Sequence, residues 1–93
     1  MCTWVTERVA IAGHGRGVPE WIHVSRANVQ YDHPASAPFE HALLLDFVDP
    51  DYGVGARIAV ELDVESAHDL LRAIQSVLSS AQAVKDYEMA IRA

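Results

Sequence analysis

The chain is poor in cysteine, in basic residues and in long hydrophobic runs. Its single cysteine, Cys2, has no second thiol to pair with, so an internal disulfide is excluded and packing must stabilise the fold. Lysine and arginine number 7 against 13 aspartates and glutamates, which gives a net charge of −6. Because phosphate groups would repel such a chain, we expect neither nucleic acid nor an anionic membrane surface as a partner.

Two further absences bear on the class of protein. No apolar run reaches the roughly 18 residues of a transmembrane helix, and no charged segment precedes a hydrophobic one at the N-terminus. We therefore expect a cytoplasmic protein. Of the 93 residues, 51% are hydrophobic and 22% charged, a composition typical of a folded chain. The length predicts a single domain over residues 1–93 with a thin core.

Alternation of apolar and polar residues predicts four strands. In the second strand the apolar positions change parity between Val24 and Ala27, which predicts a bulge near Ser25-Arg26 or a bend around the core. His23 in the same strand is expected to face outward. The third strand is apolar on both faces and therefore central. The expected strands cover residues 2–12, 21–31, 40–48 and 56–62.

Two segments rich in glycine, proline and aspartate separate these strands. Residues 13–17 are Gly-His-Gly-Arg-Gly. Such a run can form a nest of amide groups for an anion, but no helix follows it, so we expect a flexible turn. Residues 49–53, Asp-Pro-Asp-Tyr-Gly, predict a second turn, which accounts for Asp49 and Asp51 without a catalytic role.

The chain from Asp63 onward predicts helix. Asp63 is a good N-cap, and an apolar stripe at three- and four-residue spacing continues through a weak break at Ser79-Ser80. An unbroken helix over residues 64–92 would be roughly 43 Å long at about 1.5 Å per residue, longer than so small a sheet covers. Either the helix bends at Ser79-Ser80, or its tail packs against another subunit.

Together these elements predict an α+β fold. A four-stranded, mainly antiparallel sheet occupies residues 1–62, and one long C-terminal helix, continuous or broken, occupies residues 63–93 and covers the apolar face. Because one helix covers only one face of a sheet, we expect a second subunit on the other face, which includes Cys2 and Trp4. The predicted assembly is therefore a homodimer.

The main candidate site is the loop of residues 32–41, Asp-His-Pro-Ala-Ser-Ala-Pro-Phe-Glu-His. Its two prolines restrict the backbone and make the loop stiff. His33 and His41 flank it, and Cys2 lies at the start of the first expected strand. Two imidazoles and a thiolate suit a transition metal such as zinc or copper, and they leave a coordination position open for water or a substrate.

Two carboxylates adjoin the histidines. Asp32 and Glu40 would orient the metal ligands or act as a general base in a catalytic site. Two alternatives stay open. In one, the histidines hold a turn and a strand end, while Cys2 packs as a small hydrophobe. In the other, a Cys2–His41 pair activates a nucleophile without a metal.

Several short motifs along the chain resemble motifs of one protein family. They are Met1-Cys2-Thr3, Tyr31-Asp32-His33-Pro34, Glu40-His41, Asp46-Phe47 and Glu65-Ser66-Ala67. In this combination, residues 1–80 resemble a family of small actinobacterial proteins of unknown function, and the tail from Ala81 resembles an extension. The resemblance implies a compact bacterial cytosolic domain associated with secondary metabolism.

The function that this reasoning favours is metal binding at Cys2, His33 and His41, in a small protein whose enzymatic role stays open. The alternative is a non-catalytic homodimeric binding module that holds a small apolar ligand or a partner protein. The first requires both Cys2 and His33 to lie within several ångströms of His41, while the second requires only an apolar pocket.

Overall fold

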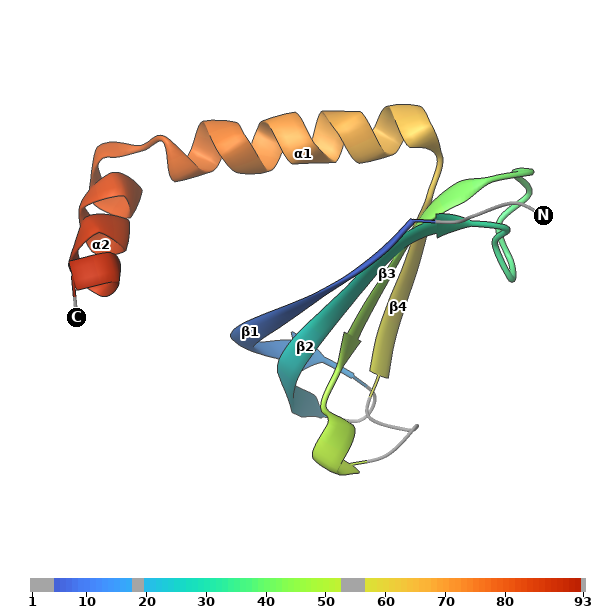
Figure 1. The fold of residues 1–93 in the computed structure, drawn as a ribbon, viewed down its shortest axis with the longest axis horizontal. Helices are drawn as coiled ribbons and strands as arrows, with labels where there is room; N and C mark the ends of the chain where they lie inside the picture. Colours follow the sequence, from blue (N-terminus) through green and yellow to red (C-terminus); the bar gives the residue numbers. More distant parts are fainter. Residues whose placement is uncertain (1–4, 18–19, 53–56, 93) are drawn as a thin grey trace.

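The chain, described by a computed structural model over residues 5–17, 20–52 and 57–92, forms a four-stranded sheet followed by two helices (Figure 1). This confirms the α+β prediction. The strands are β1 (Thr6–Arg16), β2 (Trp21–Asp32), β3 (Ala42–Val48) and β4 (Arg57–Leu62), and the helices are α1 (Val64–Leu78) and α2 (Ala81–Arg92). A short 3-10 turn, η1 (Pro50–Tyr52), confirms the predicted turn after β3.

The strands pair in chain order, β1-β2-β3-β4, and every neighbouring pair is antiparallel. Val29 pairs with Leu45, and Leu45 pairs with Val60, so these three side chains share one face. The side chains next to them along each strand, including Asn28 and Asp46, point to the opposite face. β1 and β4 are the edges of the sheet.

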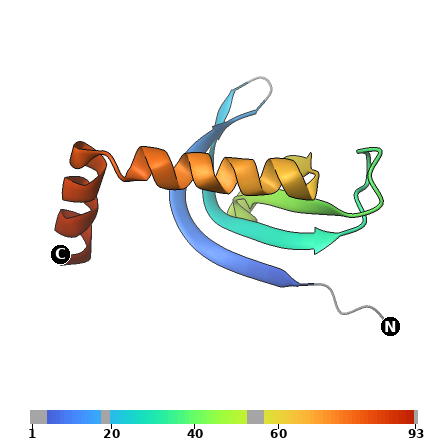
Figure 2. The ribbon, with the colours of Figure 1, turned by 90° about the horizontal axis from the view of Figure 1, so that it is seen from above.

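The change of parity in β2 is confirmed. Val24 and Ala27, three residues apart, are both buried, at 4% and 7% exposure. The register of the β1–β2 pair shifts between Ala10 and Gly13, so two residues of β1 face Ser25 alone. The extra residue of this bulge therefore lies in β1 and not in β2. Both strands bend strongly along their length (Figure 2), as expected where a bulge increases the local twist.

The predicted flexible turn over residues 13–17 is wrong. β1 continues through Arg16, and His14 pairs with His23 across the ladder. The hydrogen bond from the Gly17 amide to the Glu20 carbonyl, 3.0 Å long, closes the connection instead. Gly15 serves close packing here, because a Cβ at this position would overlap the terminal Cδ1 methyl of Ile58.

The two faces of the sheet differ in chemistry. Val29, Tyr31 and Leu43 lie beneath the first turns of α1. On the opposite face, Arg57 forms an ion pair with Asp46 at 2.9 Å. The face that we expected a second subunit to cover is therefore polar at these described positions, and Cys2 and Trp4 lie outside the described residues.

The helical part begins and breaks as predicted. The Asp63 carboxylate accepts a hydrogen bond of 2.7 Å from the Ser66 amide, which confirms Asp63 as the N-cap of α1. The helix ends at Leu78, and α2 starts after Ser79-Ser80. Figure 1 shows that α1 leaves the end of β4 and runs away from the sheet, with α2 turned across its far end. Within residues 57–92, neither helix combines the length and hydrophobicity that crossing a bilayer requires.

Candidate functional site

The loop between β2 and β3 is held by a carboxylate from β4. Glu61 accepts hydrogen bonds from three successive loop amides, those of Ala35, Ser36 and Ala37, at 2.5, 3.0 and 2.8 Å. These bonds lower the pKa of the Glu61 carboxyl below its ordinary value of 4.5, with the bond from Ala37 contributing most. The path of the loop is therefore fixed by these hydrogen bonds as well as by its two prolines.

This path brings the two candidate histidines together. The ring centres of His33 and His41 lie 5.1 Å apart, with the ring planes tilted by 37°. The His33 Nδ1 donates a hydrogen bond of 2.9 Å to the backbone carbonyl of Glu40. Because a carbonyl only accepts hydrogen bonds, Nδ1 is the donor in this bond, and in the neutral tautomer that makes it Nε2 is the nitrogen able to bind a metal.

The two candidate carboxylates adjoin this histidine pair through backbone contacts. Asp32 accepts a hydrogen bond of 2.6 Å from the His33 amide, so its carboxylate fixes the start of the loop. Glu40 contributes its main-chain carbonyl, and its side chain is exposed. Tyr31 completes the surroundings, with its ring 6.1 Å from that of His41.

Cys2, the third predicted ligand, lies outside the described residues. Across residues 5–17, 20–52 and 57–92, no three or more histidine, aspartate or glutamate side chains gather as they would around a metal ion. The described part of the site is thus a pair of imidazoles. Val5, the first described residue, accepts a hydrogen bond of 3.1 Å from the Tyr31 amide, so β1 begins next to this cluster.

Sequence reasoning missed a second histidine cluster at the other end of β2. The His23 Nδ1 donates to the Asp49 carboxylate at 3.1 Å, and the His14 ring meets the His23 ring edge to face with centres 5.6 Å apart. Asp49 is 3% exposed, whereas the His23 side chain is 52% exposed. His23 therefore faces partly outward as predicted, but it also serves a buried carboxylate.

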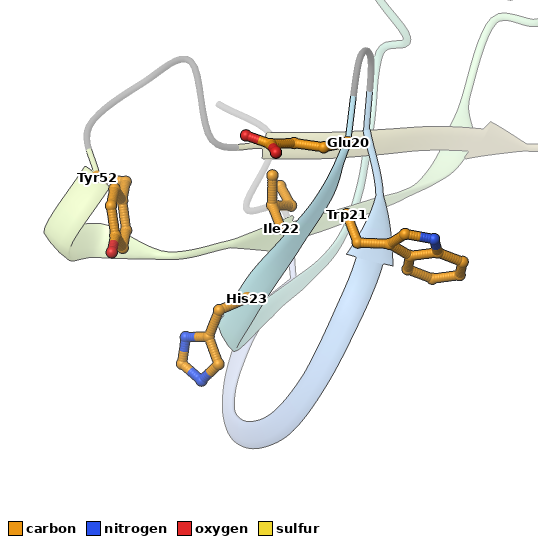
Figure 3. A pocket seen from close by; sticks show the side chains of 5 residues that line it. All are labelled: Glu20, Trp21, Ile22, His23 and Tyr52. Carbon is orange, nitrogen blue, oxygen red and sulfur yellow. The ribbon is translucent and has the colours of Figure 1, made fainter.

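Asp49 also holds the turn that follows β3. Its carboxylate accepts a hydrogen bond from the Asp51 amide, and its carbonyl accepts one from the Tyr52 amide, both at 3.1 Å. Tyr52 and His23 line a shallow cavity of about 260 Å³ at the start of β2, together with Glu20, Trp21 and Ile22 (Figure 3). The alternation of residues in the sequence predicts that Trp21 and His23 lie in β2. It does not predict that His23 contacts Asp49, because that contact depends on β2 and β3 lying side by side.

A mainly apolar pocket lies between α1 and the sheet. Its volume is about 330 Å³, and its walls come from β2, β3 and the first turns of α1. The lining residues are Val29, Tyr31, Leu43, Val64, Ala67, His68 and Leu71. Tyr31 is thus shared between this pocket and the surroundings of the histidine pair.

The chain belongs to a family of unknown function, DUF6295, because the model of that family matches residues 1–87. The match extends through Tyr87, so the expectation that everything from Ala81 onward is an extension is wrong for the first half of α2. No curated protein and no solved structure matches the chain.

Proposed function

We propose that this member of the family binds a transition-metal ion through His33 and His41, with Cys2 as a third ligand. The observation that carries the proposal is the separation of the two rings. Imidazoles bound to one tetrahedral zinc at about 2.0–2.1 Å per nitrogen have ring centres roughly 5 Å apart. The separation of His33 and His41 is 5.1 Å.

The hydrogen bond at His33 supports the same proposal. Histidines that bind metals usually donate their other ring proton to a carbonyl or carboxylate, which fixes the ring and leaves the opposite nitrogen as the ligand. The Glu40 carbonyl receives such a bond from the His33 Nδ1. Glu61 is one step further out, because its carboxylate holds the loop that connects the two histidines.

Chain connectivity makes Cys2 a suitable third ligand. Cys2 precedes Val5 by three positions in the chain, and three residue steps span at most about 11 Å. Val5 itself is hydrogen-bonded to Tyr31, whose ring adjoins His41. Two imidazoles and a thiolate favour zinc or copper and leave one position for water or a substrate. Asp32 and Glu40 are the carboxylates that would then act as a general base.

The metal content of untagged protein, purified without chelator, tests this proposal. Elemental analysis of the native chain should give stoichiometric zinc or copper, and Cys2→Ser and His41→Ala should each lower the content severalfold. His68→Ala, an exposed histidine on α1, is the matched control and should keep the metal. Native protein without metal, or an undiminished content in His41→Ala, would contradict the assignment.

The pocket between α1 and the sheet favours a second candidate function, the binding of a small apolar molecule. Its volume of about 330 Å³ and its lining, which is mostly aliphatic, suit such a ligand. Ala67→Phe would fill this space, while Ala73→Phe would add the same ring outside it. Titration with an apolar fluorescent dye should therefore give binding that Ala67→Phe abolishes and Ala73→Phe preserves. Equal binding by both variants would exclude this pocket.

A further inference from the structure

The two helices leave almost all of their apolar residues uncovered. Every residue of α1 and α2 except Ala67 and Ala83 is exposed, and neither helix has a buried residue. Among the large apolar side chains of α1, the exposed fraction ranges from 40% at Leu70 to 70% at Val77. The apolar stripe consists of Leu70, Leu71, Ile74, Val77 and Leu78 on α1, and of Val84, Tyr87 and Ile91 on α2.

Such helices need a partner to be stable. α1 has 15 residues and α2 has 12. Isolated helices shorter than about 12–15 residues are marginal in water, and most helical stability in proteins comes from packing of the apolar face. The contact of α1 with the sheet is confined to its first turns, where Val64, Ala67 and Leu71 line the apolar pocket. The rest of the stripe, from Leu70 to Ile91, stays 40–70% exposed within the described residues of the chain.

The sheet leaves apolar surface uncovered as well. Val9 and Val60 are exposed large hydrophobics. Val9 pairs with Ala27, which pairs with Phe47, and Val60 pairs with Leu45, so both valines lie on the sheet face that looks toward α1. One chain therefore carries two separate apolar surfaces, a helical stripe and a sheet face, that a partner could bury against each other.

The total surface indicates how large the missing partner is. The chain exposes 7419 Å², whereas a compact monomer of 10.2 kDa exposes about 5,300 Å². The radius of gyration is 15.3 Å, against about 12 Å for a compact domain of this length. The excess is roughly 2,100 Å² per chain, or about 4,200 Å² for two chains, which lies within the range of about 2,000–5,000 Å² that obligate homodimers bury in total.

We propose that the occupant of these surfaces is a second copy of this chain. The apolar stripe of α1 and α2 in one protomer packs on the sheet face around Val9 and Val60 of its partner. The same contact repeats in the other direction about a two-fold axis. Because stripe and sheet face belong to one chain, this single contact buries both in each protomer and closes the assembly at two subunits.

Light scattering after size exclusion of the full chain, over a wide concentration range, tests this proposal. The native protein should have twice the chain mass of 10.2 kDa. Ile74→Glu and Val60→Glu should each halve that mass, because each places a carboxylate in the apolar contact. Ser76→Glu, on the polar side of α1, and Ala59→Glu, on the polar face of β4, are the matched controls and should stay dimeric.

Three results would overturn the proposal. The first is native protein with the mass of a single chain. The second is a dimer that survives Ile74→Glu and Val60→Glu, which would place the interface elsewhere. If these glutamate variants lose their helical circular dichroism, Ile74→Ala and Val60→Ala replace them.

Each alanine variant should raise the dissociation constant of the dimer about tenfold or more. The third contradicting result is a dissociation constant that the alanine variants leave unchanged.

Discussion

The two histidine pairs at opposite ends of β2 are built differently. His33 and His41 face each other across a loop whose path is fixed by backbone hydrogen bonds, and His33 donates its Nδ1 proton to the Glu40 carbonyl. His23 instead donates to the buried Asp49 carboxylate, and His14 meets it edge to face. In the first pair the backbone positions the rings. In the second pair the His23 ring donates to the Asp49 carboxylate, which also accepts a hydrogen bond from the Asp51 amide in η1.

This difference separates a proposed ligand pair from a structural pair. At the loop, the Glu40 carbonyl accepts the hydrogen bond of His33, so the imidazole is the group that is being positioned. At Asp49, the carboxylate receives bonds from His23 and from the Asp51 amide, and together they stabilise the turn. Substitutions at the two ends should therefore change different observables, metal affinity at one and the free energy of unfolding at the other.

Among the residues that are not proposed ligands, the largest effect is expected at Glu61. Glu61→Gln weakens the bonds to three loop amides and loosens the segment between His33 and His41. Loss of a group hydrogen-bonded directly to a metal ligand typically weakens metal affinity about 10–100-fold. Because Glu61 acts through the loop and not on a ligand itself, we expect a loss of about 10-fold, which a zinc titration would measure. Glu65→Gln, an exposed carboxylate in the first turn of α1, is the control. Native zinc affinity in Glu61→Gln would show that the hydrogen bonds between Glu61 and the loop amides do not position the histidines.

Asp49→Ala should affect stability and leave zinc affinity unchanged. The substitution removes the acceptor of both the His23 ring and the Asp51 amide at a site that is 3% exposed. Loss of a buried hydrogen-bonded group costs about 1–3 kcal/mol of unfolding free energy, which denaturant titration would measure. Asp51→Ala, an exposed neighbour, should change it by less than about 0.5 kcal/mol. Equal effects of the two substitutions would refute the structural role of Asp49.

Acidification should release the loop between His33 and His41. The pKa of Glu61 is lowered chiefly by the amide of Ala37 and next by that of Ala35. A carboxyl with a lowered folded-state pKa stabilises the fold above its ordinary value of 4.5, and this contribution is lost as the pH falls through the folded pKa.

The amide chemical shifts of Ala35, Ser36 and Ala37 would report this titration in NMR spectra. In the native chain their midpoint should lie below the ordinary carboxyl value. In Glu61→Gln the three shifts should be flat across the same range. A titration midpoint at or above the ordinary carboxyl value in the native chain would contradict the hydrogen bonding of the Glu61 carboxylate to the three loop amides.

The smallest effect is expected for His14→Ala. The His14 side chain is exposed, and its described contact is the edge-to-face packing on His23. Surface substitutions of this kind change the unfolding free energy by about 0.5 kcal/mol or less, and zinc affinity should not change. A destabilisation as large as that of Asp49→Ala would mean that the two histidines act as one unit with the carboxylate.

Local signals in the sequence predicted most of the fold. The apolar alternation predicted four strands, Asp63 predicted the start of α1, and Ser79-Ser80 predicted its end. The parity change between Val24 and Ala27 predicted the bulge, although not the strand that carries it. These features succeeded because each depends on neighbours that are close in the chain.

Features that depend on distant partners could not be predicted in this way. The three glycines of residues 13–17 suggested a turn. Gly15 instead lies in β1, where the close approach of the Ile58 side chain explains why a glycine is present. His23 and Asp49 are 26 residues apart, as are Ala35 and Glu61, and only the strand pairing brings each pair together. The sequence singled out the loop between His33 and His41 as the candidate site, but the carboxylate that holds this loop in place, Glu61, was missed.

We propose that one histidine pair, His33 and His41, holds a metal and that the other, His14 and His23, does not. Calorimetric titration with zinc distinguishes the two pairs when it is carried out on the native chain, on His33→Ala/His41→Ala and on His14→Ala/His23→Ala. Stoichiometric binding is expected for the native chain and for the second double variant, and no binding is expected for the first. Zinc binding that persists without His33 and His41, or that disappears without His14 and His23, would contradict it.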